Sequence, residues 1–410
     1  MSHMAFVPGA ILSTVAPGHD TDCPGASQPV TAAGTVEQEG KRQKVKPFDE
    51  KKRAQVLDLI KKFSESNGPS GFEHETAKLA VNLAGPFGEV SVDSMQNVYV
   101  SREGFRGDRL RVQLDAHLDE VGLIVHSIRD NGMLRIQALG SWVAANIPAH
   151  VFRVRTRDGK WIHAITASKP PHYLSETERQ QGVTIEQIEL DIGARCGEEA
   201  EEKFGVYIAA PVVPDVAFAY DESHDLLLGK AFDCRLGCAA MTETLRQLDG
   251  EDLSCDVVAA YSVQEEIGGR GAVVTARRVE ADLAIVFEGT PADDYFASAD
   301  QRQTALGKGP MLRHIDRSMI THPGFQKFAL EMARKHDIPV QEGVRSGGGT
   351  NGGLIHTQGA GIPTVVIGIP VRYIHTHYGW AKLCDFEAAV ALATELLRSF
   401  DETTMEQLTV

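Results

Sequence analysis

Acidic and histidine side chains recur where apolar runs of the sequence end. Two adjacent glutamates, Glu265 and Glu266, close the apolar run 257–263, which is typical of a buried strand. His117 and Asp119 follow an alternating stretch that predicts another strand. Three further candidates stand at similar boundaries: Asp233, Glu288 and His375. Because the strand ends of an α/β sheet meet at one rim, where such folds bind ligands, we expect these side chains to converge.

Two histidines with several carboxylates are a ligand set for two zinc or similar divalent ions, and an aspartate can bridge such a pair. Paired ions lower the pKa of a bound water and polarise a carbonyl, and a leftover carboxylate can act as general base. Each residue alone also has a structural interpretation. Asp233 can cap a helix, and a histidine at a strand end is often only hydrogen-bonded. The spacing of Cys234 and Cys238, one helical turn apart, favours core packing over a thiolate pair.

The elements that must position these residues follow from periodicity and turn signals. Before residue 121 the pattern predicts two helices and three strands: 49–67, 73–83, 90–92, 97–100 and 110–114. After residue 214 it predicts helices and strands in alternation: 233–248, 257–263, 283–287, 324–336, 363–369 and a last helix capped by Asp385. Residues 121–214 instead carry short β-like runs and frequent glycine. We therefore expect an α/β domain from 47–120 and 215–405, interrupted by a small β-rich domain at 121–214.

Composition excludes several classes of protein. A net charge of −15 and the lack of a basic patch in the predicted folded part oppose nucleic acid or an anionic membrane surface as partners. No apolar run reaches the roughly 18 residues of a membrane span. The six cysteines are scattered without a Cys-x-x-Cys spacing, which predicts reduced thiols and a cytoplasmic protein.

The first 46 residues are rich in small residues and proline, end in a basic cluster and lack periodicity. This composition predicts a disordered N-terminal extension, in which residues 1–4 resemble a cloning scar. Near the other end of the chain, the glycine-rich run 346–353 lacks the Gly-Lys-Ser/Thr ending of a phosphate loop. We interpret it as a turn that lets substrate approach the backbone. Arg345, which precedes this run, is interpreted as a surface residue, with attraction of acidic substrate side chains as the alternative.

A set of motifs, taken together, resembles the tetrahedral aminopeptidase family, which includes glutamyl and deblocking aminopeptidases and cellulase M-like proteins. The resemblance covers about residues 50 to 400 and rests on these segments: Asp115-Ala116-His117-Leu118-Asp119-Glu120, Lys169-Pro170-Pro171-His172, Gly229-Lys230-Ala231-Phe232-Asp233-Cys234-Arg235, Val263-Gln264-Glu265-Glu266, Gly348-Gly349-Thr350 and Arg372-Tyr373-Ile374-His375. It implies a mixed-sheet zinc-aminopeptidase domain with helices on both faces and an inserted β-rich dimerisation domain. It also implies dimers that assemble into a dodecamer.

The resemblance assigns a role to each candidate. It implies that Asp233 bridges two ions, with His117 and Glu288 at one and Glu266 and His375 at the other; that Glu265 is the general base; and that Asp119 tunes the site. Glu288 stands where the family usually has aspartate, so Asp293 and Asp294 remain competitors, and we prefer Glu288 because the strand is expected to end there. His375 is preferred to His377 by the Arg-Tyr-Ile-His register.

The resulting prediction is a metal-dependent aminopeptidase that removes the N-terminal residue from peptides with a free N-terminus. It would carry two divalent ions per subunit, with zinc preferred and cobalt or manganese as alternatives. Two other classes stay open. Paired carboxylates also serve glycoside hydrolases, although that chemistry does not need metal-binding histidines. A non-catalytic peptide-binding homologue is the second alternative.

Overall fold

The computed structural model describes residues 48–176 and 182–408, and these fall in one compact unit. The leader predicted at residues 1–46 lies outside the described residues. No helix in the described part of the chain is long and apolar enough to cross a membrane.

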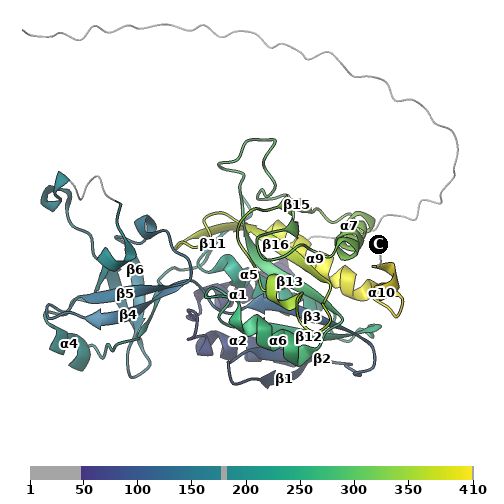
Figure 1. The fold of residues 1–410 in the computed structure, drawn as a ribbon, viewed down its shortest axis with the longest axis horizontal. Helices are drawn as coiled ribbons and strands as arrows, with labels where there is room; N and C mark the ends of the chain where they lie inside the picture. Colours follow the sequence, from purple (N-terminus) through teal and green to yellow (C-terminus); the bar gives the residue numbers. More distant parts are fainter. Residues whose placement is uncertain (1–47, 177–181, 409–410) are drawn as a thin grey trace, which may run out of the picture. The chain divides into compact units, whose positions relative to one another are not determined.

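Eight strands form one mixed sheet in the order β1-β2-β12-β3-β13-β16-β14-β15 (Figure 1). Their bounds are β1 Gly88–Val92, β2 Val98–Arg102, β3 Leu110–His117, β12 Cys255–Ser262, β13 Leu283–Pro291, β14 Met311–Ile315, β15 Gln341–Val344 and β16 Thr364–Val371. The four central strands, β12, β3, β13 and β16, run parallel to one another. Their carboxyl ends therefore meet at one rim, as the positions of the candidate residues require.

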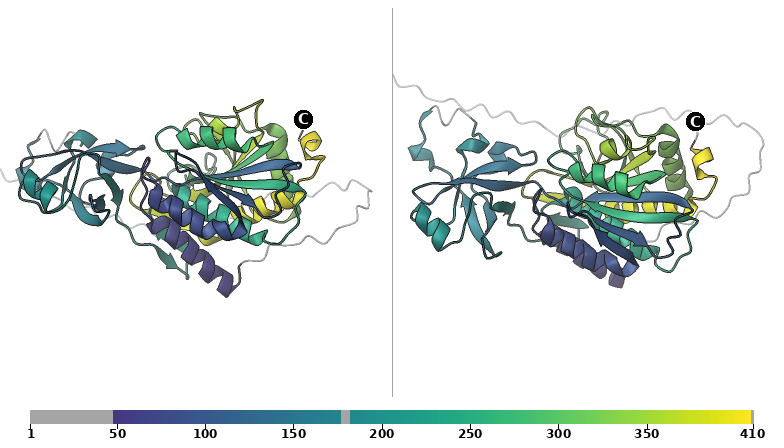
Figure 2. Two further views of the ribbon diagram at one scale, coloured as in Figure 1. Left: turned by 90° about the horizontal axis from the view of Figure 1, so that it is seen from below. Right: turned by 60° about the horizontal axis from the view of Figure 1, so that its bottom comes forward.

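Helices cover both faces of this sheet (Figure 2). Their bounds are α1 Glu50–Glu65, α2 His74–Ala84, α5 Phe232–Gln247, α6 Arg270–Val279, α7 Pro323–Lys335, α8 Gly352–Ile355, α9 Leu383–Ser399 and α10 Thr404–Gln407. Successive side chains of a strand point to opposite faces. Ile285 and Phe287 of β13 accordingly belong to the core that α5 and α9 share, whereas Ala284 and Val286 pack in a second core with α6 and α8. The predicted mixed α/β fold with helices on both faces is confirmed.

A closed six-stranded barrel interrupts this architecture between β3 and β10, in the order β4-β5-β8-β7-β6-β9. Its strands are β4 Gly122–Ile128, β5 Leu134–Leu139, β6 Val151–Arg155, β7 Trp161–Thr166, β8 Glu189–Asp191 and β9 Pro211–Pro214, with the short helix α4 Gly197–Glu202. The barrel has a hydrophobic core of its own, which includes Phe152 and Leu190. The domain boundaries near 121 and 214, and the role in dimerisation, stay predictions.

Three short strands form a separate sheet: β10 Ala219–Asp221, β11 Leu226–Gly229 and β17 Gly379–Lys382. In this sheet β11 pairs antiparallel with both β10 and β17. Because β11 leads into α5 and β17 directly follows the segment that contains His375, this sheet joins the chain segments that carry two of the candidate ligands.

Two local expectations are wrong. Strand β13 does not end at Glu288, because it stays paired with β16 as far as Pro291 opposite Val371. Asp385 does not cap α9, whose N-cap is Lys382. The Asp385 carboxylate instead accepts hydrogen bonds from the backbone amides of Gly307 and Gly309, each at 2.7 Å, so tertiary contacts hold it in the first turn.

Candidate metal centre

Strands β3 and β13 place His117 and Glu288 beside each other. Asp115 of β3 lies opposite Val286 of β13 in a parallel register, and two residues further along each strand come His117 and Glu288, on the same face of the sheet. His117 Nε2 lies 3.3 Å from Glu288 Oε1. Glu288 thus lies near His117 at the rim even though its strand continues to Pro291. The expected strand end at Glu288, which was the reason for preferring it to Asp293 and Asp294, is wrong. Its assignment as a ligand stays a prediction.

Asp233 lies between the two candidate histidines. Its backbone, with φ of −86° and ψ of 105°, is not helical although it falls within the bounds of α5, whose N-cap is Ala231. Its Oδ1 lies 3.2 Å from His117 Nε2, and its Oδ2 lies 3.4 Å from His375 Nε2. One carboxylate therefore faces two histidines that are far apart in the sequence.

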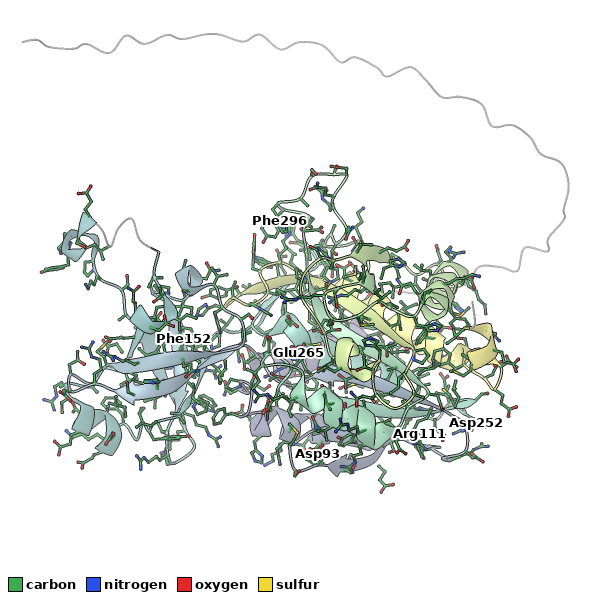
Figure 3. All side chains as sticks on the ribbon, in the orientation of Figure 1. Asp93, Arg111, Phe152, Asp252, Glu265 and Phe296 are labelled. Carbon is green, nitrogen blue, oxygen red and sulfur yellow. The ribbon has the colours of Figure 1, made fainter. Side chains whose placement is uncertain are left out.

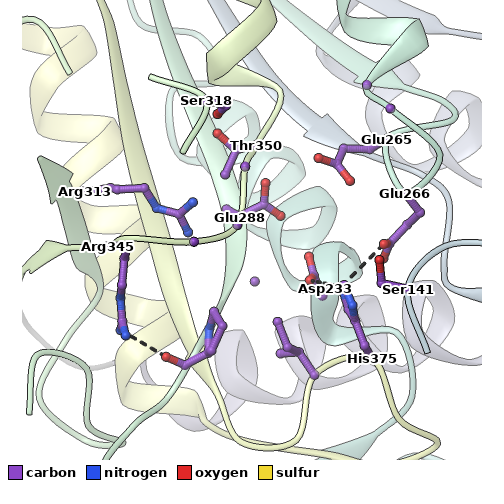
Figure 4. Close-up of a pocket in the computed structure, with 18 of the residues that line it drawn as sticks. Ser141, Asp233, Glu265, Glu266, Glu288, Arg313, Ser318, Arg345, Thr350 and His375 are labelled. Carbon is purple, nitrogen blue, oxygen red and sulfur yellow. Dashed lines mark hydrogen bonds and ion pairs between the residues drawn. The ribbon is translucent and has the colours of Figure 1, made fainter. Parts of the chain in front are cut away.

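His375 also lies 3.4 Å, through Nε2, from Glu266 Oε2, as the dashed line in Figure 4 marks. The described residues thus contain two groups that could hold a metal ion, and Asp233 belongs to both. The groups are His117, Asp233, Cys234 and Glu288, and Asp233, Glu266 and His375. His377 belongs to neither group. Its buried ring stacks on His150 at 4.0 Å between ring centres, and burial lowers the pKa of His377 to about 3.

A tight turn brings both glutamates to this centre. Strand β12 ends at Ser262, and Gln264 then adopts a φ of 58°, which is rare for a residue other than glycine. Asp119 accepts hydrogen bonds from the backbone amides of Glu265, at 2.9 Å, and Glu266, at 3.1 Å. The chain therefore leaves strand geometry just before the pair, and Asp119 holds the turn.

A second buried carboxylate completes this arrangement and was not anticipated. Glu73 accepts a hydrogen bond from the backbone amide of Gln264 at 2.9 Å, so two carboxylates hold three consecutive amides. Ser70 donates to Asp119 at 2.6 Å from the turn before α2. Glu73 is the N-cap residue of α2, and an acidic residue at the start of a helix is ordinary, so the sequence contains no local signal for this contact.

Burial shapes the ionisation of the centre. It raises the pKa of Glu265 to about 7 and the pKa values of Glu266 and Glu288 well above their usual range. Burial acts the same way on Asp233, but hydrogen bonds from His117 and His375 outweigh it and lower the pKa of Asp233. Burial lowers the pKa of His117, yet its contacts with Asp119 and Asp233 raise it overall. Burying several acidic groups side by side thus disfavours their charged forms, and a bound cation would offset this effect.

The donor set fits a divalent cation. Both carboxylate oxygens of Glu288 and Oε1 of Glu266 are buried without a hydrogen-bond partner. Nδ1 of His117 lies 3.1 Å from the backbone carbonyl of Asp119, which can only accept, so this nitrogen carries the proton and Nε2 can offer a lone pair to an ion. Buried carboxylates without donors are costly unless a proton or a cation satisfies them. Imidazole nitrogen and carboxylate oxygen are the ligand types of zinc, cobalt and manganese sites.

The centre opens into a cavity of about 660 Å³, which Figure 4 shows. Asp233, Glu265, Glu266, Glu288 and His375 line one part of it. The remaining lining includes these polar and glycine residues: Ser141, Arg313, Ser318, Arg345, Ser346, Gly347, Gly348, Gly349 and Thr350. The predicted glycine turn is therefore a wall of the cavity, where small residues leave the backbone accessible. Ser141 comes from the segment after β5, so the inserted barrel also contributes to the wall.

The competing residues are engaged elsewhere. Asp293 Oδ2 lies 3.1 Å from Arg345 Nη1, and Asp294 accepts two hydrogen bonds of 2.8 Å from Arg372. Neither aspartate belongs to a metal-binding group among the described residues. Arg345 is not the plain surface residue that was expected, because it lines the cavity and is partly buried.

An α/β sheet that gathers histidines and carboxylates at its strand ends, beside a cavity, is typical of metal-dependent hydrolases. The sequence profile of the M42 glutamyl aminopeptidase family matches residues 96–392. The chain is 32% identical over 349 residues to the lysyl aminopeptidase of Pyrococcus furiosus, covering 83% of this chain and 96% of that protein. It is 30% identical over 353 residues to the glutamyl aminopeptidase of Lactococcus lactis, covering 85% and 97%.

Solved structures agree. A TET aminopeptidase from a marine sediment archaeon of the Thaumarchaeota superposes with a TM-score of 0.83 and is 39% identical, covering 87% of this chain and 99% of that one. The TET1 peptidase of Pyrococcus horikoshii gives a TM-score of 0.76 at 26% identity, covering 84% and 100%. The chain therefore belongs to the M42 aminopeptidase family, and it is a peptidase.

Proposed function

We propose that this peptidase is an aminopeptidase with a two-ion centre, in which Asp233 bridges ions held by His117 and Glu288 on one side and by Glu266 and His375 on the other. The observation that carries the proposal is the sharing of Asp233 by two ligand groups. Zinc is the preferred ion, with cobalt and manganese as alternatives. When bound, such ions supply Lewis acidity, which makes water more acidic and polarises a carbonyl.

Glu265 is the proton carrier in this proposal. It lines the cavity beside Asp233, and its backbone amide is held by Asp119, which fixes where the side chain emerges. Burial raises the pKa of Glu265 to about 7, which suits a group that takes a proton from water and returns it to the leaving amine. Glu266 points to His375 and is left for ion binding.

The acidic residues of the centre also determine which end of the substrate binds there. A free α-amine is a cation near neutral pH, so the carboxylates of the centre attract it and place the first peptide bond of the substrate beside Glu265. The remaining cavity, between the glycine run and Arg313, is large enough for a side chain. Removal of the N-terminal residue from peptides follows from this placement.

The first test separates the base from the ligands. Glu265→Gln keeps the shape of the side chain but cannot carry the proton, so kcat is expected to fall about 10²- to 10⁴-fold while two ions per subunit are retained. Aminoacyl p-nitroanilide hydrolysis and metal analysis of the same samples measure both quantities. Substantial residual turnover in this variant would refute the role of Glu265.

Chelation supplies the control against other chemistry. Stripping the ions should abolish peptidase activity, and adding zinc, cobalt or manganese should restore it. Activity on a soluble cellulose substrate that survives chelation would instead favour a glycoside hydrolase.

We also propose that the barrel is a dimerisation surface and that dimers assemble further. Val151 of β6 and Ile165 of β7 are direct partners in the barrel sheet, and both are exposed. Exposed apolar side chains that gather on one surface mark interaction sites. The TET1 peptidase of Pyrococcus horikoshii, a similar structure, can assemble into a tetrahedron or a large octahedral shell.

A further inference from the structure

The segment that carries His375 is held in an unusual backbone conformation. Tyr373 has a φ of 67° and His375 a φ of 56°, in the left-handed region that residues other than glycine rarely adopt. Such conformations persist only where surrounding contacts hold them. The position of the His375 ring therefore depends on what fixes the chain on either side of it.

On the N-terminal side the anchor is an ion pair. Arg372 donates through Nε and Nη2 to the two oxygens of Asp294, each at 2.8 Å, and its backbone pairs with that of Trp380. A two-point contact between guanidinium and carboxylate fixes both distance and orientation. This contact holds the chain three residues before His375.

On the C-terminal side the anchor is the ring of His377, which enters an aromatic cluster of the barrel. It stacks on His150 at 4.0 Å with an angle of 21° and lies 4.6 Å from Phe152 and 5.4 Å from Trp142, both nearly edge-on. Figure 3 shows Phe152 within the barrel and Glu265 in the domain that contains the eight-stranded sheet. Phe152 is fully buried in the barrel core, and Trp142 packs against that core. His377 itself is 2% exposed.

The ring contributes packing contacts, and its Nε2 is buried without a hydrogen-bond partner. The barrel side of the cluster is itself fixed: Trp142 donates from Nε1 to the carbonyl of Gly122 at 3.0 Å, and His150 donates from Nδ1 to the carbonyl of Pro148 at 3.1 Å. Aromatic stacking of this kind is directional and stabilising.

The two candidate ligand histidines differ in how they are oriented. Nδ1 of His117 is held by the carbonyl of Asp119, as is usual for a histidine that binds a metal. Within residues 48–176 and 182–408, no hydrogen bond orients Nδ1 of His375. The orientation of His375 therefore depends on the contacts of its Nε2 with Asp233 and Glu266 and on its backbone, which is fixed two residues away at His377.

We propose that His377 is a positioning residue through which the inserted barrel sets the place of His375, so that the barrel takes part in assembling the ion centre. This inference rests on the proposed function, because it takes His375 as a ligand. It gives the insertion a role in the site of its own subunit, separate from any role between subunits.

The experiment measures ion affinity in the full-length protein. Zinc is titrated against a chromogenic chelator, and the ion lost in His375→Ala identifies the second site. His377→Ala is expected to lower the affinity for that ion about 10- to 100-fold, as for other groups that orient a metal ligand, and to leave the affinity for the other ion unchanged. His377→Phe should retain wild-type affinity, because it keeps the aromatic packing. The matched control is His163→Ala, a loss of an exposed histidine in the same barrel.

A second variant approaches the contact from the barrel. His150→Ala removes the stacked ring while Phe152 and Trp142 stay, so it should lower the affinity for the same ion by a smaller factor. This variant also serves as the test if His377→Ala does not fold. Wild-type affinity for both ions in His377→Ala, or equal losses in His377→Phe and His377→Ala, would overturn the inference. Retention of both ions by His375→Ala would instead show that the proposed two-ion function fails at this site.

Discussion

At the scale of single residues, adjacent glutamates have different surroundings. The amides of both Glu265 and Glu266 bind Asp119, but only Glu266 has its carboxylate beside His375. The turn at Gln264 allows both side chains to reach one cavity, which neighbouring residues of a regular strand cannot do. The proposed division into one ligand and one base therefore depends on the turn and on its two carboxylate supports, Asp119 and Glu73.

The choice between Glu288 and the neighbouring aspartates can be tested directly. Glu288→Gln is expected to lower the affinity for one ion by more than about 100-fold, since loss of a group that merely orients a ligand lowers metal affinity by about 10- to 100-fold. Asp293→Asn is the matched control, because Asp293 is buried nearby but faces Arg345 and should leave both affinities unchanged. Zinc titration of both variants gives the answer, and a loss confined to Asp293→Asn would assign the ligand to that residue.

At the scale of elements, the centre depends on a close approach between β13 and the start of α5. A side-chain carbon added at Gly289 would lie 2.6 Å from Cα of Asp233, which is closer than atoms can pack. Cys234, which follows Asp233, is fully buried and donates from Sγ to the carbonyl of Phe287 at 3.2 Å. The backbone of Asp233 is therefore fixed against β13, and the position of its carboxylate follows.

This contact predicts the effect of a single methyl group. Gly289→Ala should displace Asp233 and lower the affinity for both ions. It should also lower the free energy of unfolding by about 1–3 kcal/mol, as is typical of overpacking. Gly347→Ala is the matched control, because its added carbon would meet no atom within 4 Å although Gly347 also lines the cavity. Denaturant unfolding and metal analysis measure the two effects, and unchanged ion binding in Gly289→Ala would show that the approach is not needed.

At the scale of the whole molecule, the barrel has two distinct surfaces. One receives His377 near the candidate metal centre, and the other exposes Val151 and Ile165, with 42% and 53% of their surface accessible. Contiguous apolar surface is costly in water and is normally covered by a partner. The same insertion can therefore serve its own subunit and the assembly through different residues.

The assembly prediction concerns mass in solution. Ile165→Lys places a charge on the proposed contact, so light scattering should show smaller particles than wild type. Val92→Lys is the control, because Val92 is similarly exposed but lies on β1 of the large sheet. Deleting residues 1–46 tests whether the leader alters packing. A monomer in wild type and in the deletion variant would contradict the assembly proposal.

Much of the architecture was predictable because it depends on local periodicity. The N-cap at Asp49, the apolar face of α1 and the presence of strands near 110–114, 257–263, 283–287 and 363–369 follow from residue spacing, whereas the order and parallel direction of these strands do not. The errors have a common origin. At Asp385 and after Glu288, contacts with distant segments replaced the local rule, and neither Gly307 nor β16 can be inferred from the neighbouring sequence.

By itself the sequence determined the fold class and supplied candidate ligands and a candidate base, because apolar periodicity and residue chemistry can be read along the chain. Only the tertiary structure decided which groups meet. Whether Asp233 caps a helix or faces two histidines, whether His375 or His377 reaches the centre, and how Glu73 supports the turn depend on contacts between segments more than a hundred residues apart. Such contacts arise from packing, which has no period in the sequence to reveal it.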